Sequence, residues 1–209
     1  MRNLIFIIII VLANNALADY DDAIDFLNKR LIKKSIQEFN NVAKNSEKTD
    51  EKANAMYNIA VIYDNGIGIE EDKNIAIAWY KKASELNHKI AQYNLGWMYY
   101  HGEIVEQNYF NALKYYNLSA NQGYKKAQFN IATLYLVGLG TSKDNLKAYK
   151  WFKISSMNGI IQSNEFLVKL KSIMSNEEIK IAEKNVNLWV QTNTKTFSSS
   201  SENTSLENN

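Results

Sequence analysis

AQYNLGWMYYHG, at residues 91–102, recurs 36 residues earlier as AMYNIAVIYDNG and 36 residues later as AQFNIATLYLVG. The three segments align without a gap. Fixed-period similarity of this kind is typical of a solenoid, in which identical units stack and each unit contacts its neighbours. Five columns hold the same residue in all three copies: Ala55/Ala91/Ala127, Asn58/Asn94/Asn130, Tyr63/Tyr99/Tyr135, Gly66/Gly102/Gly138 and Ala76/Ala112/Ala148.

Each period has the start and stop residues of two helices. In the middle copy, apolar residues follow helical spacing up to Gly102, and glycine readily takes the left-handed conformation that ends a helix. The second helices are expected to begin after side chains that accept from free backbone amides, and to end at residues that tolerate positive φ. The starting column is Asp72/Asn108/Asp144, and the closing column is Asn87/Gly123/Gly159. The pattern predicts an all-α solenoid of antiparallel helix pairs.

Small residues at Ala60, Gly96 and Ala132 are expected to let the partner helix approach closely. Rings on the second helices would fill the space between repeats: Trp79 and Tyr80, Tyr115 and Tyr116, Trp151 and Phe152.

The motif A-x-Y-N-L-G-x-M-Y-x-x-G, followed by a capped A-x-x-W-Y helix, resembles the Sel-1-like repeat, a 36-residue relative of the tetratricopeptide repeat. The resemblance covers residues 55–162 as three copies, 55–90, 91–126 and 127–162. It implies a right-handed, tetratricopeptide-like superhelix that serves as a non-catalytic platform for other proteins. Ile104 departs from the motif where the other copies have Gly68 and Gly140, so we expect the middle loop to turn differently.

The flanking segments are expected to close the array. Residues 19–54 are interpreted as a degenerate leading helix pair, with Ile36, Phe39 and Val42 on one face. Residues 163–191 are predicted to form C-terminal capping helices, where Ser175 and Glu178 have the spacing of a capping box. Residues 192–209 have almost no apolar content and are predicted to be disordered.

The composition of the chain indicates where the protein is located and which classes of partner it can bind. Residues 1–18 have a basic start, a short apolar run and the pattern Ala16-Leu17-Ala18, which predicts a signal peptide and an exported protein, periplasmic or secreted. The apolar run is too short to span a bilayer, so no stable membrane insertion is expected after cleavage. Removing Arg2 leaves 23 of the 24 basic side chains against 22 acidic ones, which argues against nucleic acid as a partner. With no cysteine, the fold depends on packing alone.

The first helices of helix-pair solenoids line the concave surface, where a protein or peptide would bind. These positions vary between copies while the packing columns do not. The predicted partner-binding residues are Tyr57, Val61 and Asp64 in the first copy, Tyr93, Trp97, Tyr100 and His101 in the second, and Phe129, Thr133 and Leu136 in the third.

Trp97 stands where the other copies have Val61 and Thr133. With Tyr100 and His101 beside it, it would form a rigid amphipathic anchor of the kind enriched at binding hot spots. The alternative is that Trp97 packs over a neighbouring helix as part of the core.

The residue patterns that metal binding and nucleophilic catalysis require are missing from the sequence. The only histidines, His88 and His101, are thirteen positions apart and no cysteine accompanies them, so no metal or other cofactor is expected. The nucleophile motifs Ser-x-x-Lys, Lys-Thr-Gly and Gly-x-Ser-x-Gly are absent. We therefore expect no enzyme. A cell-wall hydrolase would need converging carboxylates, and Asp64 and Asp144 are the only candidates near the groove.

The sequence thus favours an exported protein that holds a protein or peptide in a groove. The alternative is a periplasmic immunity-type inhibitor that neutralises a toxic effector, and the sequence leaves the partner and the oligomeric state open.

Overall fold

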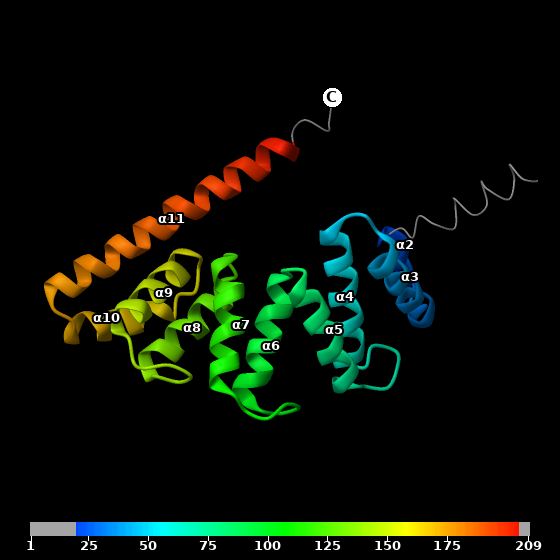
Figure 1. Ribbon diagram of the computed structural model, residues 1–209, viewed down its shortest axis with the longest axis horizontal. Helices are drawn as coiled ribbons and strands as arrows, with labels where there is room; N and C mark the ends of the chain where they lie inside the picture. The colour runs from blue at the N-terminus through cyan, green and yellow to red at the C-terminus, as the bar shows by residue number, and fades with distance from the viewer. Residues whose placement is uncertain (1–19, 205–209) are drawn as a thin grey trace, which may run out of the picture. The chain divides into compact units, whose positions relative to one another are not determined.

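Helices make up all of the regular structure in the part of the chain that the computed structural model describes, which is the backbone of residues 20–204 and the side chains of residues 20–193. Ten helices occur there, without a strand (Figure 1). The signal peptide predicted for residues 1–18 lies outside the described residues. No helix in the described range has the length and apolar character needed to cross a bilayer.

The helices form two compact units, one ending at Asn108 and the other beginning at Tyr109. In the first unit each helix packs on the next one along the chain. Its helices are α2 (Tyr20–Asn28), α3 (Ile32–Asn45), α4 (Thr49–Asp64), α5 (Lys73–Glu85) and α6 (Lys89–His101), coloured blue to green in Figure 1.

The second unit continues the same alternation of helices. α7 packs on α8 and α8 on α9, while α9 also contacts α10 and α11. Its helices are α7 (Tyr109–Asn121), α8 (Lys125–Val137), α9 (Asn145–Met157), α10 (Ser163–Ile173) and α11 (Asn176–Thr204). Because consecutive helices pair and stack in both units, the predicted fold class, an all-α solenoid, is confirmed.

The repeated columns form the interior. Both alanine columns are fully buried in every copy: Ala55, Ala91 and Ala127, then Ala76, Ala112 and Ala148. The small residues Ala60, Gly96 and Ala132 are buried too. The ring column is equally enclosed, with Tyr80, Tyr116 and Phe152 at most 1% exposed. Recurring burial of the same columns is what makes the 36-residue period visible in the sequence.

Two buried glutamines add polar contacts that the sequence did not reveal. The Gln92 side-chain amide donates to the Ser84 carbonyl at 3.3 Å, and Gln128 donates to the Ala120 carbonyl at 3.2 Å. Each bond joins a first helix to the end of the second helix before it. Each carbonyl also accepts a backbone amide at the helix end, Ser84 from Asn87 and Ala120 from Gly123, so the glutamine adds a second bond there.

Helix ends follow the predicted chemistry. Gly102 and Gly138 cap α6 and α8 in the left-handed conformation, with φ of 73° and 86°. Asp72 and Asp144 accept from the backbone amides of Ile75 and Lys147, each at 2.9 Å. Positive φ also occurs at all three closing positions, Asn87, Gly123 and Gly159.

The middle loop turns differently from its counterparts, as the motif departure predicts. Gly68 and Gly140 have φ of 66° and 71°, whereas Ile104 is not among the residues with positive φ. A β-branched residue rarely adopts that region, so its presence favours another turn.

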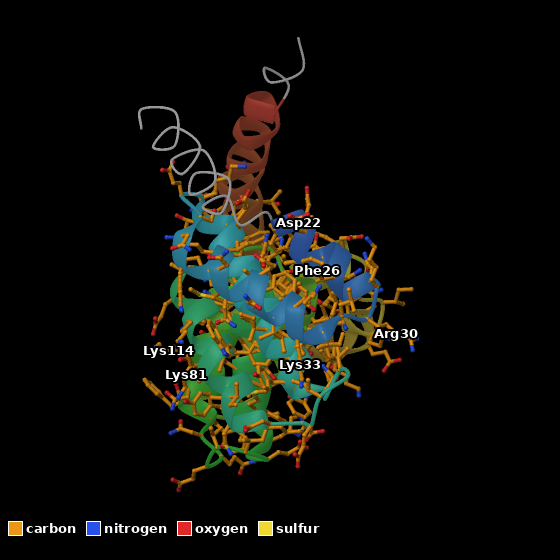
Figure 2. The ribbon with its side chains drawn as sticks, turned by 90° about the vertical axis from the view of Figure 1, so that its right-hand side faces the viewer. Asp22, Phe26, Arg30, Lys33, Lys81 and Lys114 are labelled. Atoms are coloured by element: carbon orange, nitrogen blue, oxygen red, sulfur yellow. The ribbon has the colours of Figure 1, made fainter. Side chains whose placement is uncertain are left out.

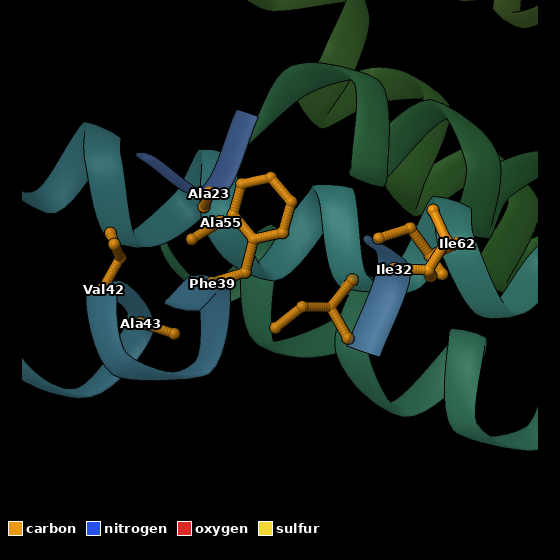
Figure 3. Packing of buried hydrophobic residues seen from close by; sticks show 8 residues of the cluster. Ala23, Ile32, Phe39, Val42, Ala43, Ala55 and Ile62 are labelled. Carbon is orange, nitrogen blue, oxygen red and sulfur yellow. The ribbon is translucent and has the colours of Figure 1, made fainter. Parts of the chain in front are cut away.

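The leading pair is the helical hairpin α2–α3. Phe39 and Val42 are fully buried in one cluster with Ala23 and Ala55 (Figure 3). Ile36 is partly buried and packs against this cluster. This core joins the leading pair to the first repeat.

The C-terminal helices cap the last repeat. Ser175 and Glu178 form the predicted capping box: Ser175 N donates to Glu178 Oε2 at 2.8 Å, and Glu178 N donates to Ser175 Oγ at 3.2 Å. The Tyr149 hydroxyl on α9 donates to Glu183 on α11 at 2.6 Å. The rings of Trp151 and Trp189 meet edge to face across the same pair of helices, with centroids 5.8 Å apart.

The structure continues α11 to Thr204, through part of the segment predicted to be disordered from residue 192. No glycine or proline interrupts this helix. Thr192 and Asn193 turn their polar groups onto the carbonyls of Leu188 and Trp189 one turn earlier, at 2.8 and 2.9 Å. Residues 205–209 lie outside the described residues.

Candidate protein-binding site

The predicted binding residues lie on the first helix of each repeat, α4, α6 and α8. His101 is exposed and the other nine are partly buried. α4 and α6 belong to the first unit and α8 to the second, so the structure places them as three local groups.

The residues of the first copy are engaged within their own unit. The Tyr57 ring stacks on His88, with centroids 4.3 Å apart and planes inclined by 20°. The Tyr80 hydroxyl donates to Asp64 Oδ2 at 3.0 Å, and burial, followed by the Asp64 charge, raises the pKa of Tyr80. Tyr57 and Asp64 therefore help to hold α4, α5 and the start of α6 together.

His88 has a structural role that sequence reasoning missed. Its Nδ1 accepts from the Ala91 amide at 3.1 Å, so the side chain caps α6. Burial, with a smaller effect of Lys89, lowers the pKa of His88 to about 4. The neutral ring is required because a protonated Nδ1 has no lone pair to accept the amide. The only available signal was the position of His88 directly before a first helix.

The second copy assembles an aromatic group at the end of α6. The His101 ring lies 4.2 Å from the Trp97 ring and 5.0 Å from the Tyr100 ring, centroid to centroid. We call Trp97, Tyr100 and His101 the α6 aromatic cluster. Helix geometry brings positions 97 and 101 together because residues four apart lie on the same face. The fourth predicted residue of this copy, Tyr93, is one turn before Trp97 and is partly buried.

The residues of the third copy belong mainly to the packing of the second unit. Phe129 meets Phe152 and Phe166 edge to face at 5.6 and 5.7 Å, and Phe152 stacks on Phe166 at 4.6 Å. Thr133 Oγ1 donates to the Phe129 carbonyl at 3.2 Å. Among the three copies, the second is thus the one whose varied rings cluster around an exposed side chain.

The carboxylates considered for hydrolysis both hold structural bonds. Asp64 accepts from Tyr80, while Asp144 caps α9 and pairs with Lys147 at 3.1 Å. Throughout the described range, no group of three or more His, Cys, Asp or Glu side chains is arranged to hold a metal ion.

Comparisons with known proteins bear on these repeats. A family model described as Sel1 repeat matches residues 53–88, 89–124 and 125–160. The chain is similar to the crystal structure of a Sel1 repeat protein from Oxalobacter formigenes, with 26% identity, a TM-score of 0.62, and coverage of 71% of this chain and 59% of that one.

A second solved structure is c5321, a protective antigen present in uropathogenic Escherichia coli strains and displaying an SLR fold. It shows 22% identity, a TM-score of 0.49, and coverage of 76% of this chain and 41% of that one. The chain therefore spans about 59% and 41% of the lengths of these two proteins. A search of the curated proteins found no match.

Proposed function

Because the chain belongs to the Sel1 repeat family, we propose that it is an exported, non-catalytic protein that binds a protein or peptide partner through the α6 aromatic cluster. Sel1 repeat proteins generally mediate protein–protein interaction. The family thus supports a binding role, and the geometry of α6 supports the surface.

The observation that carries this proposal is the contact of Trp97 and Tyr100 with the exposed His101 ring. The fully buried side chains of α6 include Ala91, Leu95 and Met98, whereas Trp97 and Tyr100 are only partly buried. This difference in burial supports a surface role for the cluster. Rings held against one another lose little conformational freedom on binding, which favours affinity.

Export is proposed from the signal pattern of residues 1–18, with the mature protein in the periplasm or outside the cell. Expression of the full chain in a bacterium, cell fractionation and N-terminal sequencing would test it. The expected product is a periplasmic or secreted chain that begins at Asp19. A full-length chain retained in the cytoplasm would overturn this part of the proposal.

The binding surface is tested by affinity capture from envelope extract with the wild type, Trp97→Ala and Tyr100→Ala as baits. Phe110→Ala is the matched control, because Phe110 is a ring 68% exposed on α7 and outside the cluster. One stoichiometric partner should be recovered by the wild type and the control, and its affinity should fall at least tenfold with either cluster variant.

Thermal unfolding of the same variants separates binding from packing. Trp97→Ala should cost less than the roughly 3–5 kcal/mol expected for a fully buried ring. A loss of that full size, with unchanged affinity in Tyr100→Ala, would show that Trp97 is core and overturn the site. Recovery of a secreted toxin as the partner would specify an immunity-type inhibitor.

A further inference from the structure

The turn between α2 and α3 borders an open groove of about 750 Å³ in the first unit. Its apolar lining includes Leu27, Leu31 and Ile67, and its basic lining consists of Arg30, Lys33 and Lys34. We call it the α2–α3 groove. Leu31 and Ile67 are 44% and 38% exposed, so apolar surface remains open to a ligand.

The basic side chains of the groove are not held in ion pairs within the described residues. No carboxylate lines it, and neither Arg30 nor Lys33 forms an ion pair with any described residue. Lys34 lies over the Phe26 ring, with Nζ 5.7 Å from its centroid. Lys29, which does not line the groove, instead pairs with Asp25 at 2.6 Å. Figure 2 labels Phe26 on α2, Arg30 in the turn and Lys33 on α3.

A neighbouring hollow of about 560 Å³ shares Lys33 and is lined by Glu70, Glu71 and Asp72. Two of these acids have local roles: Glu71 pairs with Lys73 at 3.6 Å, and Asp72 caps α5. The two hollows that meet at Lys33 therefore differ in the charge of their lining, which is basic in the α2–α3 groove and mainly acidic beside the segment between α4 and α5.

Arg30 occupies a backbone position that suits glycine. Its φ is 58°, and the turn is closed by bonds from Arg30 N to the Leu27 carbonyl at 3.0 Å and from Leu31 N to the Phe26 carbonyl at 2.9 Å. Helices commonly end this way with glycine at the left-handed position. An arginine is strained there and a glycine is not, so the arginine side chain is expected to provide something that glycine cannot.

We propose that the α2–α3 groove is a second binding site, which takes a segment of a partner protein that carries carboxylates beside an apolar side chain. The apolar side chain packs on Leu27, Leu31 and Ile67. The carboxylates meet Lys33, Lys34 and the planar guanidinium of Arg30, which can hold a carboxylate through two parallel hydrogen bonds.

The occupant follows from charge and shape. The predicted signal peptide, residues 1–18, contains no acid and does not complement the basic lining. Segments that bind anionic membranes usually gather four to eight basic residues, whereas three line this groove. A recess of this volume also suits an inserted side chain better than a flat lipid surface.

The test selects random twelve-residue peptides displayed on phage against the full chain, with counter-selection on Arg30→Gly. This variant removes the charge and relieves the positive φ, so its thermal midpoint should equal or exceed that of the wild type. Lys33→Gln is a second variant, and Lys29→Gln is the matched control that removes one adjacent charge outside the groove. The binding constant of the labelled consensus peptide is then measured for each.

We expect the selected peptides to be rich in aspartate or glutamate next to an apolar residue. Their affinity should fall at least tenfold in Arg30→Gly and Lys33→Gln and stay within twofold in Lys29→Gln. Retention of affinity in Trp97→Ala would separate this groove from the α6 aromatic cluster.

Four results would overturn the proposal. They are selection of no peptide or of peptides without acids, equal losses in Lys29→Gln, loss only in Trp97→Ala, and sedimentation of the chain with phosphatidylserine vesicles in an Arg30-dependent manner.

Discussion

Replacing Gly140 with alanine should be among the most damaging single-methyl changes in the second unit. A Cβ at this position would lie 2.2 Å from the carbonyl oxygen of Tyr109 and 2.4 Å from its carbonyl carbon. The obstacle is backbone at the start of α7, which cannot rotate away as a side chain can. The loop and the helix must therefore move apart.

Two costs add at this position. Gly140 has φ of 71°, and an alanine in left-handed conformation costs roughly 1–2 kcal/mol. Forcing an extra carbon into a packed contact costs typically about 1–3 kcal/mol more. The free energy of unfolding of the second unit should thus fall by about 2–5 kcal/mol.

Two other glycines serve as controls. Gly159 has φ of 89° and no atom within 4 Å of its Cβ position, so Gly159→Ala carries the conformational cost alone. At Gly68 the Cβ would meet the Ile32 side chain, 2.6 Å from Cγ1, which can adjust in part. The expected order of loss is Gly140→Ala, then Gly68→Ala, then Gly159→Ala.

Urea unfolding followed by circular dichroism measures these losses. Gly140 and Gly159 lie in the same unit, which makes their comparison direct. Equal destabilisation by the two substitutions would refute the reasoning, because it would mean that the contact with Tyr109 adds nothing to the conformational cost.

Three further perturbations test other contacts. Burial lowers the pKa of His88 to about 4 from its ordinary 6.5, so the contribution of the neutral ring to stability is complete above pH 6.5 and is lost as pH falls towards 4. The His88→Asn variant can still cap α6 but does not titrate, so its thermal midpoint should fall less between pH 6.5 and 4 than that of the wild type. An equal fall in thermal midpoint for the two proteins would contradict this. Tyr149→Phe removes the bond to Glu183 and should cost about 1.5 kcal/mol in urea unfolding, whereas Glu183→Gln, which still accepts, should cost less. Asp144→Ala removes the cap of α9 and should lower the free energy of unfolding by about 1 kcal/mol. Asp144→Ser restores an acceptor, so this prediction is wrong if the serine variant is no more stable than the alanine variant.

The features that sequence predicts well here are those fixed by local chemistry and repetition. Asp72 and Asp144 are readable as caps because a helix start needs an acceptor within a few residues. The fully buried Ala55, Ala91 and Ala127 are readable because the same steric demand recurs in each copy. Both inferences depend on the sequence alone and require no knowledge of which distant residues come into contact.

Features that depend on contacts between helices were beyond the sequence. Tyr57 and Phe129 share a column with Tyr93 and resemble groove residues, yet one stacks on His88 and the other packs on Phe152. The period places these side chains on a face but does not specify what faces them. For the same reason, only the structure of the α2–α3 turn shows that Arg30 forms no ion pair with a described residue.

The four tryptophans fall two to a unit: Trp79 and Trp97 before Asn108, Trp151 and Trp189 after it. Each unit therefore contains its own fluorophores. If one pair is changed to phenylalanine, the emission that remains reports on a single half of the protein. Coincident curves from the two complementary variants would show that the halves melt as one cooperative body, and separated curves would give each half its own stability.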